Sequence, residues 1–526
     1  MKYHKTIWIL GAILFFVGCT NLDEEVFDKL PAEDFGQSEV EVNALMGSAY
    51  NTLKKYWPNN FMYLSECGGS AAVTPTRKGG DWYDGGQFRE LYMHTWTAHT
   101  NMIKDSWSAA SGAIGICNAT IKMIGESTIL SEEEKESRTI EMRGLRAFWI
   151  YTMVDYWGNV PLVTEYGTDK SLPECKSRQE VFTWLLNELK EITPKAKRPT
   201  TALYGKFTQG AGYTLLAKLY LNADAWGVKT DKENSSQNML EVITQCNNVD
   251  GLGFYQLENN WVTNFSPSNN LSKEAIFAIP FSSQDTDDKN QLMNRTLHYK
   301  DQHTIGASFS AWNGICAQPD YVKLFDKEDP RFKQTYLIGQ MYDINTGEKL
   351  ITDHGFPLDH TIDVSIIKGT ERDGTNWGDV NQHDGARCQK WPYERSLVDA
   401  MENDFHIFRL ADIYLMKAEA LIRLNQNPAE AKELVNRIRR RAYGDTNHDL
   451  PQVSLEEIAL ERKFEFAWEA HSRQDDIRFG SYEKPMWSAS NCDRDKGEHL
   501  KLYPIPHDAW QTNQKLTQNP GYTPFK

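Results

Sequence analysis

The sequence predicts a mainly α fold, in which a scaffold of antiparallel helical pairs carries a large, loop-rich region with minor β structure. Amphipathic helical patterns occupy most of residues 39–250 and return over 405–480. Between them, residues 251–404 are rich in Gly, Asn and Asp, and residues 60–105 are a second loop-rich stretch. Helical periodicity interrupted by turn-forming residues is typical of long loops on a helical frame.

The first residues predict an export signal. Lys2 and Lys5 precede an apolar run over 7–17, which is too short to span a bilayer. A basic start, a short apolar centre and a small residue, Gly18, at the end are typical of a signal peptide. We therefore interpret residues 1–18 as a signal peptide.

The residue after this signal is Cys19. The placement resembles the lipobox of bacterial lipoproteins, which implies lipidation of Cys19 and a membrane anchor. The alternative is a buried cysteine after an ordinary signal peptide.

With Cys19 lipidated, residues 19–38 form a tether between the membrane and the folded chain. The acids at 23–25 either resemble a surface-export signal or simply keep the tether solvated. Residues 39–526 are predicted to form a single domain.

Composition restricts the function further. The formal net charge is −15, which argues against nucleic-acid binding, because phosphate contacts need a basic surface. The eight cysteines are scattered, without zinc-type spacing, so we assign no metal ligands and no cofactor, and we leave a calcium ion and a disulfide open.

The first half of the scaffold is predicted from apolar residues at helical spacing, such as Val42, Leu45, Ala49 and Leu53. Gly and Pro after residue 157 stop one helix. The predicted helices cover 39–57, 106–126, 132–158, 177–196, 206–226 and 236–249.

The middle of the chain predicts short strands at 274–281 and 334–342 and a helix at 319–326. Several of the 16 Trp lie in polar, Gly-rich stretches, such as 79–88 and 309–318. An indole in such a loop either packs on its own domain or offers a flat surface to a ligand, and sugar rings are natural ligands for it.

Two further helices are predicted at 408–424 and 427–443, where Asn427 caps the second helix and Pro428 occupies its first position. Short turns and small alanines at the crossings resemble tetratricopeptide repeats. In 460–480 the charges alternate, and we interpret them as ion pairs that clamp the scaffold rather than as an acid–base site.

Five segments together resemble the SusD/RagB family of nutrient-uptake lipoproteins. They follow the family's order along nearly the whole mature chain, with the lipobox-like site before them. They cover residues 143–165, 204–223, 408–442, 460–480 and 502–522.

The resemblance implies a tetratricopeptide-like scaffold with a loop-rich ligand face. It implies a lipoprotein on the outer face of the outer membrane that captures an oligosaccharide or another large nutrient. It also implies delivery to a SusC-like TonB-dependent transporter and no catalysis.

The resemblance also implies sugar-stacking aromatics. Trp82 precedes Trp96 by 14 residues, and Trp312 precedes Phe325 by 13, which matches the family's stacking positions. Tyr299 is a weaker match. Gly85 stands where starch binders place a sugar-bonding Asn, so starch itself is in question.

The neighbours of these aromatics are candidate polar contacts for the ligand. They are Tyr83, Asp84, Arg77 and Arg295.

Two other functions compete with glycan capture. A helical-repeat scaffold that binds only proteins is the main alternative. A glycoside hydrolase is less favoured, because the sequence places no carboxylate pair in a cleft and contains no GxSxG, HExxH or P-loop motif.

Overall fold

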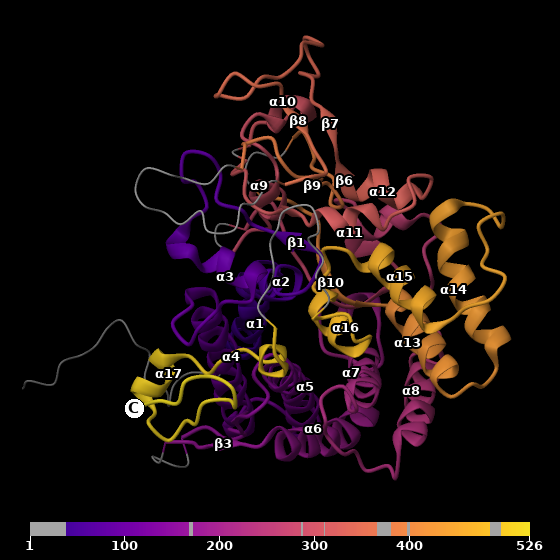
Figure 1. The fold of residues 1–526 in the computed structure, drawn as a ribbon. Helices are drawn as coiled ribbons and strands as arrows, with labels where there is room; N and C mark the ends of the chain where they lie inside the picture. Colours follow the sequence, from indigo (N-terminus) through magenta and orange to yellow (C-terminus); the bar gives the residue numbers. More distant parts are fainter. Residues whose placement is uncertain are drawn as a thin grey trace, which may run out of the picture.

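The structure, a computed structural model of the chain, describes residues 38–167, 172–285, 288–309, 311–364, 380–396, 400–483 and 496–526. The helices fill the lower part of the molecule, and the middle region of the chain forms most of its upper part (Figure 1). Cys19 and the predicted signal peptide and tether lie outside the described residues.

The scaffold begins with α1 (Glu39–Tyr56), followed by the antiparallel helices α4 (Asn101–Glu126) and α5 (Glu132–Trp157). Ser38 and Ser131 each cap a helix, and a Glu in the first turn completes a reciprocal capping box. Such boxes satisfy backbone N–H groups that otherwise lack partners, so they determine where the helices start.

The scaffold continues through α6 (Arg178–Ile192), α7 (Gln209–Asn222) and α8 (Ser235–Asp250) to α13 (Leu410–Arg423) and α14 (Pro428–Tyr443). Each helix packs on the one before it, and α13 packs directly on α8 (Figure 1). The middle region is therefore inserted between two helices that are neighbours in space. This arrangement confirms the predicted helical pairs.

The C-terminal helices follow the predicted capping. Asn427 accepts a hydrogen bond from the Glu430 N–H, and Pro428 is the first residue of α14. The scaffold is completed by α15 (Leu455–Phe466) and α16 (Ser472–Arg478).

The remaining helices are short. They are α2 (Met62–Glu66), α3 (Gln87–Met93), α9 (Leu292–Thr296), α10 (Asp301–Ile305), α11 (Pro319–Lys323), α12 (Pro330–Thr335) and α17 (His507–Thr512).

All strands in the described ranges form two-stranded antiparallel sheets. The pairs are β1 (Ala72–Val73) with β5 (Cys316–Ala317), β2 (Val160–Pro161) with β3 (Cys175–Lys176), β4 (Ala275–Ile279) with β10 (Phe405–Arg409), β6 (Tyr336–Leu337) with β9 (Arg387–Cys388), and β7 (Gly339–Gln340) with β8 (Asp359–His360).

Three predicted elements differ from the structure. The strand predicted at 334–342 contains the end of α12 and the two short strands β6 and β7. The helix predicted at 408–424 starts only at Leu410, because Phe405–Arg409 pairs with β4 as a strand. The loop predicted over 60–105 contains α2, α3 and the start of α4.

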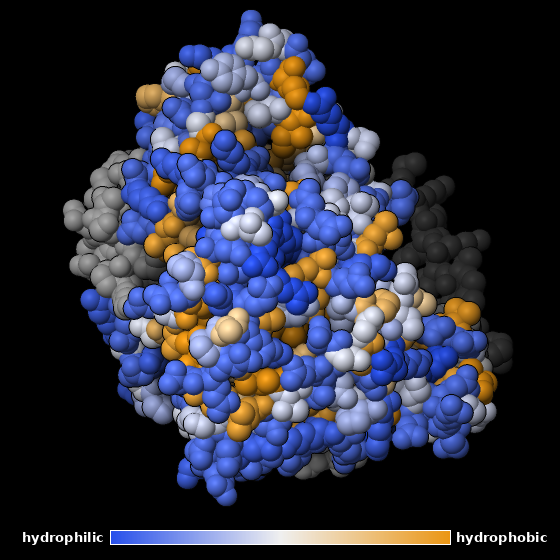
Figure 2. Space-filling view, turned by 90° about the vertical axis from the view of Figure 1, so that its right-hand side faces the viewer, coloured by the Kyte–Doolittle hydropathy of each residue, from blue (hydrophilic) through white to orange (hydrophobic). Residues whose placement is uncertain are grey.

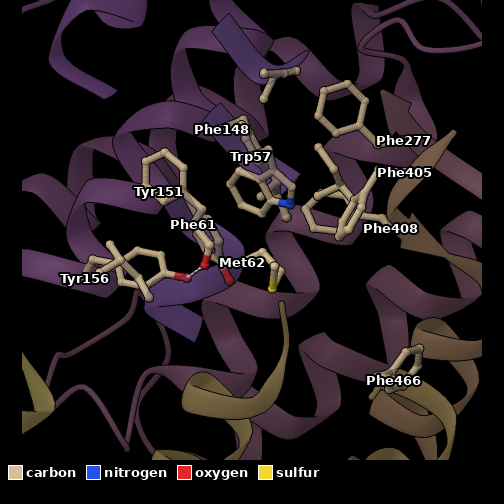
Figure 3. Packing of buried hydrophobic residues seen from close by; sticks show 14 of the residues in the cluster. Trp57, Phe61, Met62, Phe148, Tyr151, Tyr156, Phe277, Phe405, Phe408 and Phe466 are labelled. Atoms are coloured by element: carbon tan, nitrogen blue, oxygen red, sulfur yellow. Dashed lines mark hydrogen bonds between the residues drawn. The ribbon is translucent and has the colours of Figure 1, made fainter. Parts of the chain in front are cut away.

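The hydrophobic core joins α1, α5 and the β4–β10 pair. The ring of Phe148 on α5 lies 5.0 Å from Trp57 and 5.4 Å from Phe277, measured between centroids. Beside them, the Tyr156 hydroxyl donates to the Phe61 carbonyl oxygen at 3.4 Å (Figure 3). Tilted aromatic pairs of this kind add to the free energy gained by burial, and here they attach the inserted strand β4 to the scaffold.

A buried charge network also joins the middle region to the scaffold. Its side chains are at most 4% exposed. Arg441, Arg409 and Arg331 hold the pKa of Glu465 well below its usual value, even though burial alone would raise it. The pairs, with their N···O distances, are Arg331–Glu461 (2.8 Å), Arg331–Glu465 (2.9 Å), Lys390–Glu469 (2.6 Å) and Arg409–Glu274 (3.4 Å).

The predicted ion-pair role of 460–480 is therefore confirmed. Some partners lie within the segment, as in Lys463–Asp476 and Arg478–Asp475, and others lie in distant segments, as in Arg331–Glu465. None of the helices in the described ranges combines the length and the hydropathy that a bilayer crossing requires.

Candidate functional site

Trp82 and Trp312, the two positions that the resemblance implies for sugar stacking, lie together. The indole Nε1–H of Trp82 donates to the carbonyl oxygen of Trp312 at 2.6 Å. The segment after Trp312 runs beside α9, where the Gly314 N–H donates to the Arg295 carbonyl oxygen at 2.8 Å. Three segments far apart in sequence thus meet at one surface in the upper part of the molecule. We call Trp82, Trp312 and Tyr299 the aromatic platform.

Trp82 is partly built into the fold. It has a positive φ of 61°, its ring lies 5.3 Å from Phe88, and it packs against the main core. A Cβ atom at Gly314 would stand 2.3 Å from the Trp82 ring, so only glycine leaves room for the indole. Of the two alternatives for an indole in such a loop, Trp82 therefore at least packs on its own domain.

Trp312 is attached differently. Its N–H donates to the Asn294 carbonyl oxygen at 2.6 Å, and the guanidinium of Arg295 lies 5.2 Å from the centre of its ring. The Trp312 side chain is half-buried and is not part of the hydrophobic core. A cation on an indole face stabilises the orientation of the ring, so Arg295 holds Trp312 in place.

Tyr299 joins the same surface through its hydroxyl, which donates to the Asp81 carboxylate. Burial and then the hydrogen bond to Asp81 raise the pKa of Tyr299 above its usual value. Asp81, which the sequence reasoning missed, therefore fixes this ring beside Trp82. Its position directly before Trp82 in a Gly-rich turn was the available signal.

The remaining predicted contacts differ in exposure. Tyr83 is half-buried, and Asp84 is exposed in a turn with a positive φ of 40°. Gly85 and Gly86 follow with φ of 70° and 89°, in the left-handed region that favours glycine. Asp84 is thus the predicted polar residue with an exposed carboxylate next to Trp82.

Arg77 lies beneath the surface rather than on it. Its side chain is fully buried. Its guanidinium donates to four carbonyl oxygens, those of Asn313 (3.1 Å), Gly314 (3.0 Å), Asn381 (3.2 Å) and Asp384 (2.6 Å). In this arrangement Arg77 positions the loop that carries Trp312 and does not reach the exposed surface.

A second buried arginine supports the same loop, and sequence reasoning missed it. Arg387 donates to the Asn313 side-chain oxygen and to the Gln382 carbonyl oxygen, both at 2.7 Å. Burial, together with repulsion from Arg77, lowers the pKa of Arg387 to about 9. Because Asn313 lies far away in sequence, no local pattern identifies Arg387 as a support of this loop.

The surface therefore offers indole and phenol rings together with exposed carboxylates. Rings of this kind stack on apolar C–H faces, and the polar groups beside them hydrogen-bond hydroxyls. Across the described ranges, no three His, Cys, Asp or Glu side chains gather closely enough to hold a metal ion.

Known proteins resemble this chain over most of its length. The family model described as SusD family matches residues 273–522. The starch-binding protein SusD of Bacteroides thetaiotaomicron is 25% identical over 75% of this chain and 74% of its own length. A SusD-like protein of Bacteroides ovatus is 22% identical over 91% of this chain and 83% of its own.

Solved structures share the fold. A laminarin-binding SusD-like protein superposes with a TM-score of 0.70 at 22% identity, covering 92% of this chain and 100% of its own. Surface glycan-binding protein A of Bacteroides thetaiotaomicron, solved with laminarihexaose, gives a TM-score of 0.70 at 17% identity, covering 91% and 99%. The helical scaffold and the inserted loop region are thus those of SusD-like proteins, and the SusD family model matches residues 273–522 of this chain.

Proposed function

We propose that this protein captures an oligosaccharide on the aromatic platform and delivers it to a TonB-dependent transporter of the outer membrane. The observation that carries the proposal is the pairing of Trp82 with Trp312 at a loop surface, with Tyr299 fixed beside them. The platform is held by hydrogen bonds and a buried arginine before any ligand arrives, and such preorganisation lowers the cost of binding.

The names of the relatives support binding rather than catalysis. SusD is described as starch-binding, and one structural neighbour was solved with laminarihexaose. A glycan is accordingly the ligand class that we propose for this chain. Gly85 lacks the side chain that would bond a sugar, so we do not extend the proposal to starch.

The location and the partner belong to the same proposal. A lipid on Cys19 would hold the protein at the cell surface, and the outer faces of the helical pairs would contact a SusC-like transporter. The position of the platform supports separate surfaces for the ligand and for the transporter, because Trp82 and Trp312 lie on loops and leave the scaffold helices free for a partner.

Trp312→Ala tests glycan capture most cleanly, because Trp312 lies outside the core. In native gels loaded with laminarin or amylopectin, we expect the wild type to be retarded. The variant should bind about tenfold more weakly, since a binding hot spot contributes about 1–3 kcal/mol. Its thermal midpoint should stay within a few degrees of the wild-type value.

Trp184→Ala is the matched control. Trp184 is also half-buried and lies under an arginine, with the Arg146 guanidinium 5.5 Å from its ring, but it belongs to the scaffold helix α6. Its retardation should equal that of the wild type. Equal retardation of Trp312→Ala and the wild type would contradict the proposal.

A further inference from the structure

The chain between β7 and β8 forms a projecting arm. We call residues 339–360 the β-arm. Its strands pair through Gly339–His360 and Gln340–Asp359, and further bridges join Tyr342 to Lys349 and Ile351 to Pro357. The arm lies in the upper part of the molecule (Figure 1), where hydrophobic patches stand between hydrophilic side chains (Figure 2).

The arm has one buried side and one exposed side. Met341, Leu350 and Leu358 form a small core of their own. The apolar side chains left exposed are Tyr342 (46%), Ile344 (47%), Ile351 (42%) and Phe356 (43%). The arm thus builds its own core and still presents apolar groups to solvent, which is typical of a binding surface.

The arm is attached to the residues that carry the platform. Lys300, the residue after Tyr299, donates to the Ile351 carbonyl oxygen at 2.7 Å and pairs with Asp353 at 2.8 Å. The Ile344 N–H donates to the His303 carbonyl oxygen at 3.0 Å. The β-arm is therefore held against the segment that positions Tyr299.

Phe356 of the arm lies against the loop that carries Trp82. The ammonium of Lys78 lies 5.9 Å from its ring centre, and the His383 ring lies 5.9 Å away. Lys78 and Trp82 belong to one short stretch, so their Cα atoms are at most about 14 Å apart. Phe356 thus lies beside the short stretch that also carries Trp82.

We infer that Phe356 is a further binding residue, at which a longer, uncharged oligosaccharide makes a second stacking contact beyond the platform. This inference rests on the proposed function. The side chains around the turn carry both signs, with Lys78 cationic and Asp81, Asp84 and Asp353 acidic, all of them exposed. The acids outnumber the cation, which disfavours an anionic ligand and favours one that offers hydroxyls and apolar ring faces.

The test measures affinity against ligand length. The probes are malto- and laminari-oligosaccharides, from disaccharide upward, titrated by calorimetry. For the wild type we expect affinity to rise with length until the ligand spans both contacts. For the shortest ligands that the wild type binds, the affinity of Phe356→Ala should equal that of the wild type. For the longest ligands, Phe356→Ala should bind about tenfold more weakly than the wild type. Phe356→Trp should keep the rise of affinity with ligand length.

Tyr166→Ala is the matched control. Tyr166 is 53% exposed and lies under Lys122 at 5.8 Å, much as Phe356 lies under Lys78, but it follows β2 on the scaffold. This variant should behave as the wild type at every length.

Two outcomes overturn the inference. If Phe356→Ala gains affinity with length as the wild type does, Phe356 is not a contact, and the proposed function stands. If the wild type binds none of these probes and is retarded by neither laminarin nor amylopectin, the proposed function fails and the inference fails with it.

Discussion

At the scale of single residues, the two platform tryptophans contribute differently to folding. The Trp82 ring packs against Gly314, and its indole N–H donates to the Trp312 carbonyl oxygen. Trp312 is held by a backbone hydrogen bond and by the guanidinium of Arg295. A substitution at Trp82 therefore changes folding and binding together, and one at Trp312 changes mainly binding.

Gly314→Ala is expected to displace the Trp82 ring. The new methyl group would stand 2.3 Å from the indole, and overpacking of this kind costs about 1–3 kcal/mol of folding free energy. The displaced ring loses its hydrogen bond to Trp312, so we expect a changed near-UV circular dichroism spectrum and weaker retardation in glycan gels.

Gly112→Ala is the control for that substitution. Gly112 is an exposed residue of α4 with open space around its Cβ position, so alanine should be neutral or slightly stabilising there. An unchanged Trp82 signal in Gly314→Ala would show that the indole does not depend on this glycine.

At the scale of elements, Glu66 links α2 to the start of α16. Its carboxylate accepts hydrogen bonds from the N–H groups of His471 (3.1 Å) and Ser472 (3.5 Å). Burial raises the pKa of Glu66 to about 7 from its ordinary value of 4.5. The folded protein therefore holds this proton over a range in which the unfolded chain has released it.

The free energy of unfolding should therefore fall as pH rises from about 4.5 to 7. In this range the folded state keeps the Glu66 proton while the unfolded chain releases it, so each step up in pH favours the unfolded chain. The loss attributable to Glu66 is about 3 kcal/mol. Glu66→Gln keeps the accepting oxygen and should flatten this part of the curve, measured by urea unfolding at several pH values. Glu132→Gln, at a side chain that is 91% exposed, should leave the curve unchanged.

The sequence predicts the elements better than it predicts their contacts. The α14 helix follows from its own Asn427 cap and its apolar stripe, both of which are local. The Phe405–Arg409 strand does not, because its partner β4 lies more than a hundred residues away. Strands that are stabilised by distant partners carry little local signal.

The platform shows the same division. The family spacing identified Trp82 and Trp312 separately as stacking positions, and their contact with each other appears only in the structure. Arg77 was expected to face the ligand because it precedes Trp82, but its carbonyl partners come from residues 313–314 and 381–384. Burial by distant loops is not readable from neighbouring residues.

At the scale of the whole molecule, the proposed attachment depends on a single residue. Cys19→Ala should move the protein from the membrane fraction to the soluble periplasm, because no lipid can then be added. Fractionation and external protease treatment of intact cells measure this. A variant that stays membrane-bound and protease-accessible would contradict the anchor assignment.

The buried charge network also determines how this protein can be re-engineered. Glu274, Arg331 and Lys390 of the inserted region neutralise Arg409, Glu461, Glu465 and Glu469 of the scaffold. A chimaera that exchanges only the exposed loops preserves every pair. One that replaces the whole insertion without matching these three positions would leave uncompensated charges in the interior, at about 3–5 kcal/mol for each broken pair. New ligand specificities should therefore be grafted at the tips of the loops, with their bases left intact.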